Sequence, residues 1–99
     1  MVKNYYLIGE VSKVLGIHEQ TIRMYEKKKL IKPHRSKKNT RLFTTTDILR
    51  LNLVTTLTQE LGMNLSGVKL VFALGKKLDM NEEELLDFIV HNENDFITS

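Results

Sequence analysis

The sequence predicts a mostly α-helical fold that carries one small two-stranded β-ribbon. Three observations lead to this prediction. Apolar residues recur at three- and four-residue spacing through most of the 99 residues, which is typical of amphipathic helices. Gly16 separates the first two of these helical segments. Further along, a polar, turn-forming stretch lies between two short segments that favour an extended conformation.

The first two helices are expected over about residues 7–15 and 19–28. The apolar residues of the first segment share one face, and Gly16 follows directly as a residue that tolerates positive φ at a helix end. Glu19 at the start of the second segment and Lys27 near its end suit the helix dipole. Two short helices joined by a glycine turn form a helix-turn-helix.

The ribbon is expected from residues 30–33 and 41–44. Pro33 disfavours helix for the residue before it and confines its strand to a sheet edge. Residues 36–40 form the polar turn, in which Asn39 tolerates a left-handed conformation. A helix-turn-helix followed by a basic ribbon is a winged-helix arrangement.

A long third helix is expected to follow the ribbon. Thr44 and Asp47 have the spacing of a capping box, with Asp in place of the usual Glu or Gln. The apolar stripe then continues to about Leu61, and Gly62 ends the helix.

The last part of the chain predicts two more helices. Asn64 or Ser66 caps the first of them, and residues 75–77 mark a break. Asn81 caps the final helix, and a polar stretch at residues 92–95 is expected to end the ordered structure.

Charge is distributed unevenly between the two halves of the chain. Residues 1–50 hold twelve Lys or Arg against four Asp or Glu, a net of +8, whereas residues 51–99 hold three against eight, a net of −5. Nine Lys or Arg and a single acid, Glu26, lie between residues 23 and 41. Such a dense basic run favours binding to a polyanion, and nucleic acid is the expected partner.

Other functional classes lack their sequence signals. There is no cysteine, so the chain has no disulfide, thiolate metal centre or cysteine nucleophile. No apolar run approaches the ~20 residues that span a bilayer and no signal peptide begins the chain, so an intracellular protein without a membrane partner is expected. Neither a glycine-rich phosphate loop nor a nucleophile elbow is present, and catalysis and cofactors are not expected. His18, His34 and His91 have no partners at ligand spacing, so no metal site is expected.

From residue 8 to residue 74 the chain resembles the N-terminal DNA-binding domain of MerR-type bacterial transcription regulators. Five segments carry the resemblance: IGEV at 8–11, TIRMYE at 21–26, LIKP at 30–33, RLF at 41–43 and DILRL at 47–51. Within this family, residues 16–26 and 57–68 are most similar to the HspR heat-shock repressor branch. Two departures are Lys29, where the family often has Gly, and Met24, where many relatives have Tyr.

The resemblance implies that residues 1–75 form a MerR-like winged-helix DNA-binding domain, with residues 18–28 as a recognition helix in the major groove. Residues 76–99 are then a short acidic helix and tail for dimerisation or partner contact. The DNA-binding residues implied are His18, Gln20, Thr21, Arg23, Tyr25, Lys37, Lys38 and Arg41.

Structural alternatives stand beside several of these assignments. Tyr25 is equally expected to pack its ring in the core, and Arg41 to pair with Glu26 and brace the ribbon. His18 is a candidate helix cap, and Glu19 is more simply a partner of the helix dipole than a reader of cytosine.

The leading functional hypothesis is a dimeric, cytoplasmic and nucleoid-associated HspR-like repressor of heat-shock genes. The resemblance further implies the DnaK chaperone as its co-repressor. Two alternatives remain: a chaperone modulator that binds a DnaJ-like co-chaperone without DNA, and an excisionase-like architectural protein that bends DNA.

Overall fold

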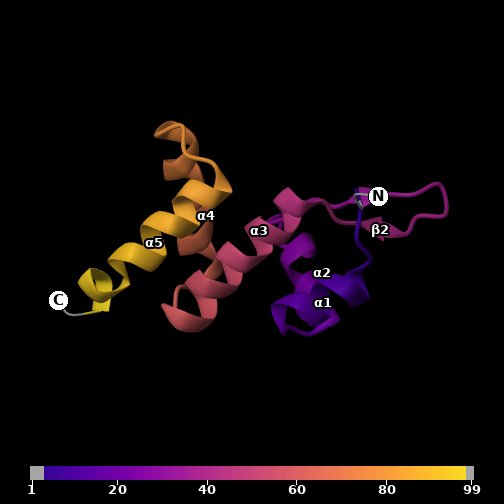
Figure 1. Ribbon diagram of the computed structural model, residues 1–99, viewed down its shortest axis with the longest axis horizontal. Helices are drawn as coiled ribbons and strands as arrows, with labels where there is room; N and C mark the ends of the chain where they lie inside the picture. Colours follow the sequence, from indigo (N-terminus) through magenta and orange to yellow (C-terminus); the bar gives the residue numbers. More distant parts are fainter. Residues whose placement is uncertain (1–3, 98–99) are drawn as a thin grey trace. The chain divides into compact units, whose positions relative to one another are not determined.

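The computed structural model describes residues 4–97 and divides into two compact units, Met1–Asn52 (unit 1) and Leu53–Ser99 (unit 2). The fold is mostly helical with one two-stranded antiparallel sheet, which confirms the predicted fold class (Figure 1). The elements in chain order are α1 (Ile8–Leu15), α2 (Glu19–Lys27), β1 (His34–Arg35), β2 (Arg41–Leu42), α3 (Thr45–Thr55), the π-helix η1 (Thr56–Glu60), α4 (Leu65–Lys77) and α5 (Glu82–Ile97).

The helix-turn-helix of unit 1 forms as predicted. Gly16 adopts the left-handed conformation with φ +67°, and its amide donates to the Ser12 carbonyl at 2.9 Å. This closes α1 and turns the chain into α2. Val11 and Ile22 are fully buried, one from each helix, and they belong to the core of this unit.

The first strand lies further along the chain than predicted. Residues 30–33 do not pair; instead β1 begins at His34, so that His34 lies opposite Leu42 and Arg35 opposite Arg41. Leu30 is buried in the core, and Pro33 has no amide to donate to a ladder, so pairing starts only after the proline.

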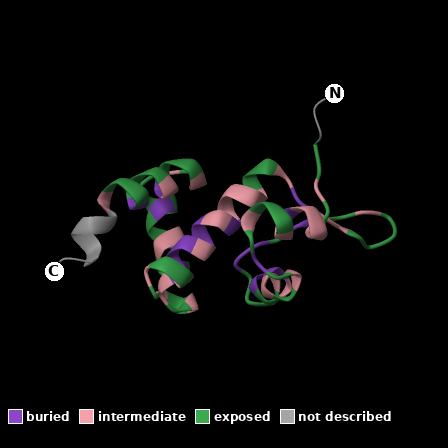
Figure 2. Ribbon diagram, turned by 60° about the horizontal axis from the view of Figure 1, so that its bottom comes forward, coloured by how far each residue is buried: buried purple, intermediate pink, exposed green. Residues whose placement is uncertain are grey.

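The tip of the ribbon is stabilised locally. Asn39 has φ +66°, as predicted, and the Ser36 hydroxyl accepts hydrogen bonds from the amides of Lys38 and Thr40 at 3.2 and 3.1 Å. Residues 37–40 are exposed throughout (Figure 2). The tip therefore holds its shape while its side chains face solvent.

Lys29 keeps the left-handed backbone that a glycine adopts easily. Its φ is +64°, and the following amide of Leu30 donates to the Tyr25 carbonyl at 2.9 Å. The chain leaves α2 through this turn although Lys29 carries a side chain. A non-glycine residue in this conformation costs about 1 kcal/mol.

The capping box before α3 is confirmed. The Thr44 hydroxyl accepts from the Asp47 amide at 3.1 Å, and the Asp47 carboxylate accepts from the Thr44 amide at 2.9 Å. The predicted uninterrupted helix to Leu61 is wrong in one respect, because the π-helix η1 follows α3 before Gly62, at φ +66°, ends the segment. The Thr58 hydroxyl donates to the carbonyl of residue 54 at 2.9 Å, a type of bond that often distorts helices.

Unit 2 follows the predicted caps but not the predicted break. The Asn64 side chain accepts from the Gly67 amide at 2.8 Å, and Asn81 and Glu84 cap α5 reciprocally at 2.8 and 3.0 Å. The helix α4 continues through Gly75 to Lys77 instead of breaking there.

Close packing explains why Gly75 lies inside a helix. A Cβ at this position would come within 2.6 Å of the Leu85 Cδ1 atom, so the missing side chain lets the two helices approach.

The helix α5 also continues past residues 92–95 to Ile97. No helix in the described part of the chain is long and apolar enough to cross a bilayer.

Candidate nucleic-acid interface

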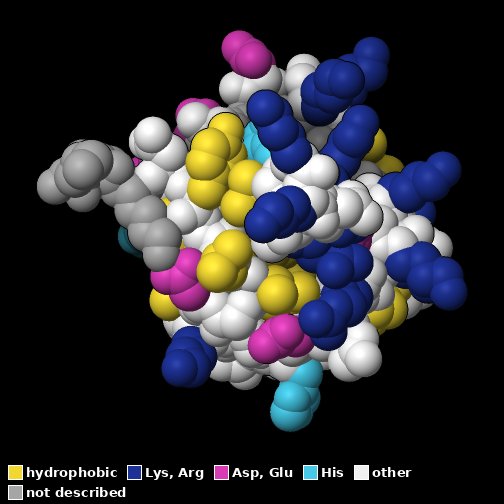
Figure 3. All heavy atoms as spheres, turned by 90° about the vertical axis from the view of Figure 1, so that its right-hand side faces the viewer, with side chains coloured by type: hydrophobic (Ala, Val, Ile, Leu, Met, Phe, Trp, Pro, Cys, Tyr) yellow, Lys and Arg dark blue, Asp and Glu magenta, His cyan; other side chains and the backbone are white. Residues whose placement is uncertain are grey.

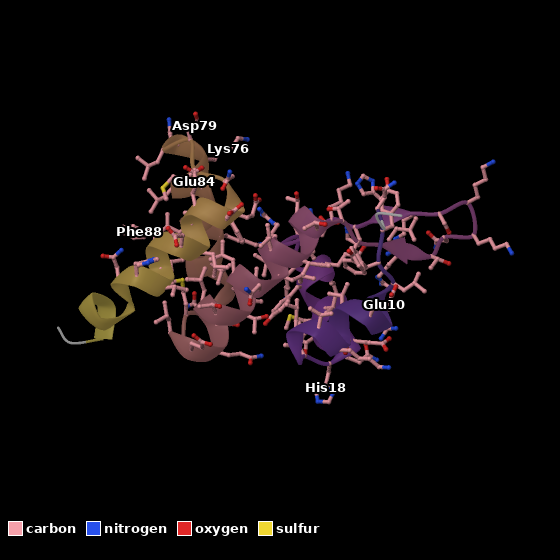
Figure 4. The ribbon with its side chains drawn as sticks, viewed as in Figure 1. Glu10, His18, Lys76, Asp79, Glu84 and Phe88 are labelled. Carbon is pink, nitrogen blue, oxygen red and sulfur yellow. The ribbon has the colours of Figure 1, made fainter. Side chains whose placement is uncertain are left out.

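The start of α2 presents three of the predicted DNA-binding residues at the surface of unit 1. His18 is the N-cap residue, and its side chain makes no capping hydrogen bond, so the capping alternative for His18 is wrong. Figure 4 shows the His18 side chain projecting away from the helix. Gln20 is exposed and Thr21 is half-buried. This end of α2 is accessible to a partner.

Arg23 forms an ion pair within α2. Its Nη2 atom lies 3.2 Å from Oε1 of Glu19, one helical turn earlier. Both side chains are about 40% exposed, at 37% and 43%, so the pair lies at the surface. Glu19 therefore has a partner of its own besides the helix dipole.

Glu26 connects α2 to both strands of the ribbon. Its Oε1 atom accepts from Nε of Arg41 at 2.7 Å, and its Oε2 atom accepts from Nη2 of Arg35 at 2.8 Å. Arg35 also donates through Nη1 to the Asn39 carbonyl at 3.2 Å. The alternative that Arg41 braces the ribbon through Glu26 is confirmed.

The two arginines beside Glu26 favour the ionised form of its carboxylate. Burial raises its pKa, but the hydrogen bonds and charges of Arg41 and Arg35 outweigh this and hold the pKa below its ordinary value. Glu26 is therefore ionised at neutral pH and neutralises part of the charge of two arginines. Arg41 uses its Nε atom for the ion pair with Glu26. The Nη1 and Nη2 atoms of Arg41 make no hydrogen bond to any residue between 4 and 97.

The remaining predicted residues divide between surface and core. Lys37 and Lys38 are exposed at the ribbon tip. Tyr25 is only 3% exposed and packs in the core of unit 1, which supports the packing interpretation. A phosphate contact by its hydroxyl stays a prediction.

An open surface depression of about 670 Å³ lies between α1, α2 and the ribbon on unit 1. It is lined by the beginning of α1, by Glu19 of α2 and by residues 39–41 of the ribbon. The two elements that the sequence predicts to contact DNA thus border a common depression.

All four acidic side chains of residues 1–50 have partners inside unit 1. Glu10 accepts from the Leu7 amide at 2.9 Å and Asp47 caps α3, while Glu19 and Glu26 pair with arginines. None of them pairs with a lysine among the described residues. Seven described lysines of unit 1 therefore carry uncompensated charge: Lys13, Lys27, Lys28, Lys29, Lys32, Lys37 and Lys38. Figure 3 shows Lys and Arg side chains gathered on the side that bears the ribbon.

Two arginines contribute to the site in ways that motif spacing did not indicate. Arg35 joins the Glu26 cluster because the ribbon register places it opposite Arg41. Arg50 donates through Nε to the Leu30 carbonyl at 2.6 Å and so ties α3 to the turn after α2.

No group of three His, Asp or Glu residues that could hold a metal ion occurs in the part of the chain that the structure describes.

Comparisons with known proteins show which family the chain belongs to. Residues 6–74 match the family model of the MerR HTH family regulatory proteins. A Streptomyces coelicolor protein that carries the name heat shock protein HspR is 35% identical over 69 residues, which is 70% of this chain and 46% of that protein. The chain thus matches about half the length of this curated relative.

A solved structure is similar over nearly the whole chain. The crystal structure of HiNmlR, a MerR family regulator lacking the sensor domain and bound to promoter DNA, aligns with a TM-score of 0.70 at 29% identity. The match covers 95% of this chain and 70% of that one. From the family model, the fold and these two relatives, the chain belongs to the MerR HTH family of regulatory proteins.

Proposed function

We propose that the chain binds double-stranded DNA sequence-specifically and regulates transcription. One observation on unit 1 carries the proposal. The first residues of α2 are exposed, and the ribbon beside them has two lysines at its tip, Lys37 and Lys38, that no acidic side chain pairs with among the described residues. A duplex supplies the phosphates that these lysines need and a major groove that admits a helix. The DNA-bound state of HiNmlR supports this choice of partner.

The residues divide into two roles. His18, Gln20 and Thr21 face base edges or the adjacent backbone at the start of α2, where Gln20 suits adenine. Lys37 and Lys38 contact flanking phosphates, which set the register and the salt dependence of binding but not the sequence preference.

The arginines act from held positions. The Glu26 carboxylate holds the Nε atom of Arg41 at 2.7 Å. The Nη1 and Nη2 atoms of Arg41 then bind a DNA phosphate. Arg23, held by Glu19, reaches guanine or a phosphate.

More specifically, we propose an HspR-like repressor of heat-shock or chaperone genes that acts as a homodimer at the nucleoid in the cytoplasm. The likeness to the Streptomyces protein supports the heat-shock assignment. In this proposal residues 1–75 bind DNA, residues 76–99 serve dimerisation or partner contact, and the DnaK chaperone is the co-repressor.

An electrophoretic mobility shift tests the proposal directly. The full chain is titrated onto inverted-repeat DNA from chaperone promoters at physiological salt, with unlabelled random duplex as competitor. We expect a shift that the random competitor does not remove. No shift, or a shift that random DNA abolishes, refutes sequence-specific binding.

A chaperone modulator that does not bind DNA is the competing function. That role needs no basic ribbon, and the uncompensated Lys37 and Lys38 argue against it. Recovery of a DnaJ-like co-chaperone in a pull-down, together with no affinity for any duplex, would reverse the assignment.

A further inference from the structure

Two carboxylates lie on the side of α2 that borders the ribbon, although this surface is proposed to meet DNA. Glu19 and Glu26 are seven residues apart, which is close to two helical turns, so they share one side of the helix. A carboxylate repels phosphate, and neither residue attracts a duplex through its own charge. Both pair with arginines instead, and Glu26 pairs with two of them.

The Glu26 carboxylate reaches both strands of the ribbon at once. Arg41 on β2 donates to it through Nε at 2.7 Å, and Arg35 on β1 donates through Nη2 at 2.8 Å. The three side chains are only 22–35% exposed, so salt screens these bonds less than it screens a fully exposed pair. Each guanidinium is therefore held by a short, charge-assisted hydrogen bond.

The two arginines have different tasks. Arg35 also donates through Nη1 to the Asn39 carbonyl at 3.2 Å, and so it links Glu26 to the ribbon tip that carries two lysines. Arg41 makes no second bond of this kind to residues 4–97, and its Nη1 and Nη2 atoms remain available to a phosphate. One carboxylate thus sets the position of the ribbon tip and of a phosphate-binding guanidinium relative to α2.

The same helix carries the residues proposed to contact bases. Gln20 lies six residues before Glu26, which is about 9 Å along the helix axis. On a preferred site the base contacts of α2 fix where the protein lies on the duplex, so Arg41 must meet one particular phosphate. On random DNA no base contact fixes this register, and any phosphate within reach neutralises the charge. The position of Arg41 therefore affects binding to the preferred site more than binding to random DNA.

We propose that Glu26 is a specificity-determining positioning residue, which holds Arg35 and Arg41 and thereby sets the distance between the base contacts of α2 and the phosphate contacts of the ribbon. Glu26 acts through the two arginines and does not itself touch DNA. This inference rests on the DNA binding proposed above. It reverses what charge alone predicts, because the loss of an acid from a basic surface would otherwise strengthen binding to every duplex.

Fluorescence anisotropy of the full chain tests the proposal with two duplexes of equal length, one selected by the chain from random DNA and one of random sequence. Glu26→Gln is expected to bind the selected duplex about fivefold or more weakly, because the phosphate contact of Arg41 is no longer held in place. Its affinity for the random duplex is expected to stay unchanged or rise by up to about twofold, because a negative charge is gone.

Two further variants separate position from charge. Glu26→Asp keeps the charge but withdraws the carboxylate by one methylene group, so it is also expected to lose preference for the selected duplex. It decides the question if circular dichroism shows that Glu26→Gln is unfolded at the assay temperature. Glu60→Gln is the matched control, since it removes the same charge from an exposed residue of η1 and leaves the preference unchanged.

A double-mutant comparison separates positioning from a general effect on stability. In the Arg41→Ala background, Glu26→Gln is expected to reduce the preference by a smaller factor than in the wild-type chain, because the guanidinium that Glu26 positions is gone. A general loss of stability would weaken binding by the same factor in both backgrounds and on both duplexes.

Three outcomes overturn the inference and leave the proposed function standing. They are tighter binding of Glu26→Gln to both duplexes, equal losses on both duplexes, and an undiminished loss in the Arg41→Ala background. A wild-type chain that binds the selected and the random duplex with the same affinity refutes the proposed function itself, and the inference with it.

Discussion

Replacing Glu26 by glutamine tests the ion-pair cluster that joins α2 to the ribbon. The carboxylate bridges Arg35 and Arg41, which lie opposite each other in the ribbon, at 2.8 and 2.7 Å. Exposed ion pairs each contribute about 0.2–1 kcal/mol, and these side chains are only 22–35% exposed. We therefore expect Glu26→Gln to lower the free energy of unfolding by about 1–2 kcal/mol at neutral pH and low salt.

The same cluster predicts a defined pH dependence. The pKa of Glu26 is lower in the folded chain than its ordinary value, because the two arginines outweigh the effect of burial. Its stabilisation is therefore present above the unfolded pKa and is lost as the pH falls through the folded pKa. The difference between the wild-type chain and Glu26→Gln should disappear in strongly acidic solution and shrink in about 1 M salt.

Urea unfolding followed by circular dichroism measures this difference. Glu19→Gln is the matched control in the same helix, since Glu19 makes one ion pair at 3.2 Å and its side chain is 43% exposed. Its expected loss is at most about 1 kcal/mol, from one exposed ion pair and the helix dipole, and smaller than that of Glu26→Gln. The reasoning fails if Glu26→Gln loses no more stability than Glu19→Gln, or if its loss is the same at acidic and neutral pH.

Further variants test single features of the chain. Lys29→Gly should raise the free energy of unfolding by about 0.5–1 kcal/mol, because glycine relieves the left-handed strain at φ +64°; Lys29→Ala retains the strain, and an equal gain in both variants would contradict this. Asn81→Ala should lower stability by about 1 kcal/mol through loss of the cap on α5, and an unchanged urea midpoint would show that this cap contributes nothing. Lys38→Ala should weaken binding to every duplex and reduce the slope of log affinity against log salt by about 1 in fluorescence anisotropy. Gln20→Ala should relax preference at particular base pairs in a selection from random DNA, and equal losses on specific and random DNA would refute its base contact.

The features predicted correctly from the sequence are those set by residues close together in the chain. Gly16 closes α1, Thr44 and Asp47 cap α3, and Asn81 caps α5, as expected. Each of these depends on one side chain or one backbone conformation acting within about four residues. The charge separation between the halves was likewise readable from composition alone.

The features that differed depend on residues far apart in the chain. Burial of Leu30 and its bond to Arg50, twenty positions away, keep residues 30–33 out of the ribbon. Gly75 continues α4 because Leu85 occupies the space where a side chain would lie. Local propensity contains no information about either contact.

The site divides in the same way. The basic run indicated a nucleic-acid partner, and the family resemblance implied DNA contacts by His18, Gln20 and Lys38, whose side chains are exposed in the structure. Only the tertiary structure decided that Tyr25 is buried and that one carboxylate, Glu26, holds two arginines from opposite strands. Charge and periodicity are properties of the chain itself, whereas the pairing of a given carboxylate is settled by the strand register and by the packing that brings the ribbon to α2.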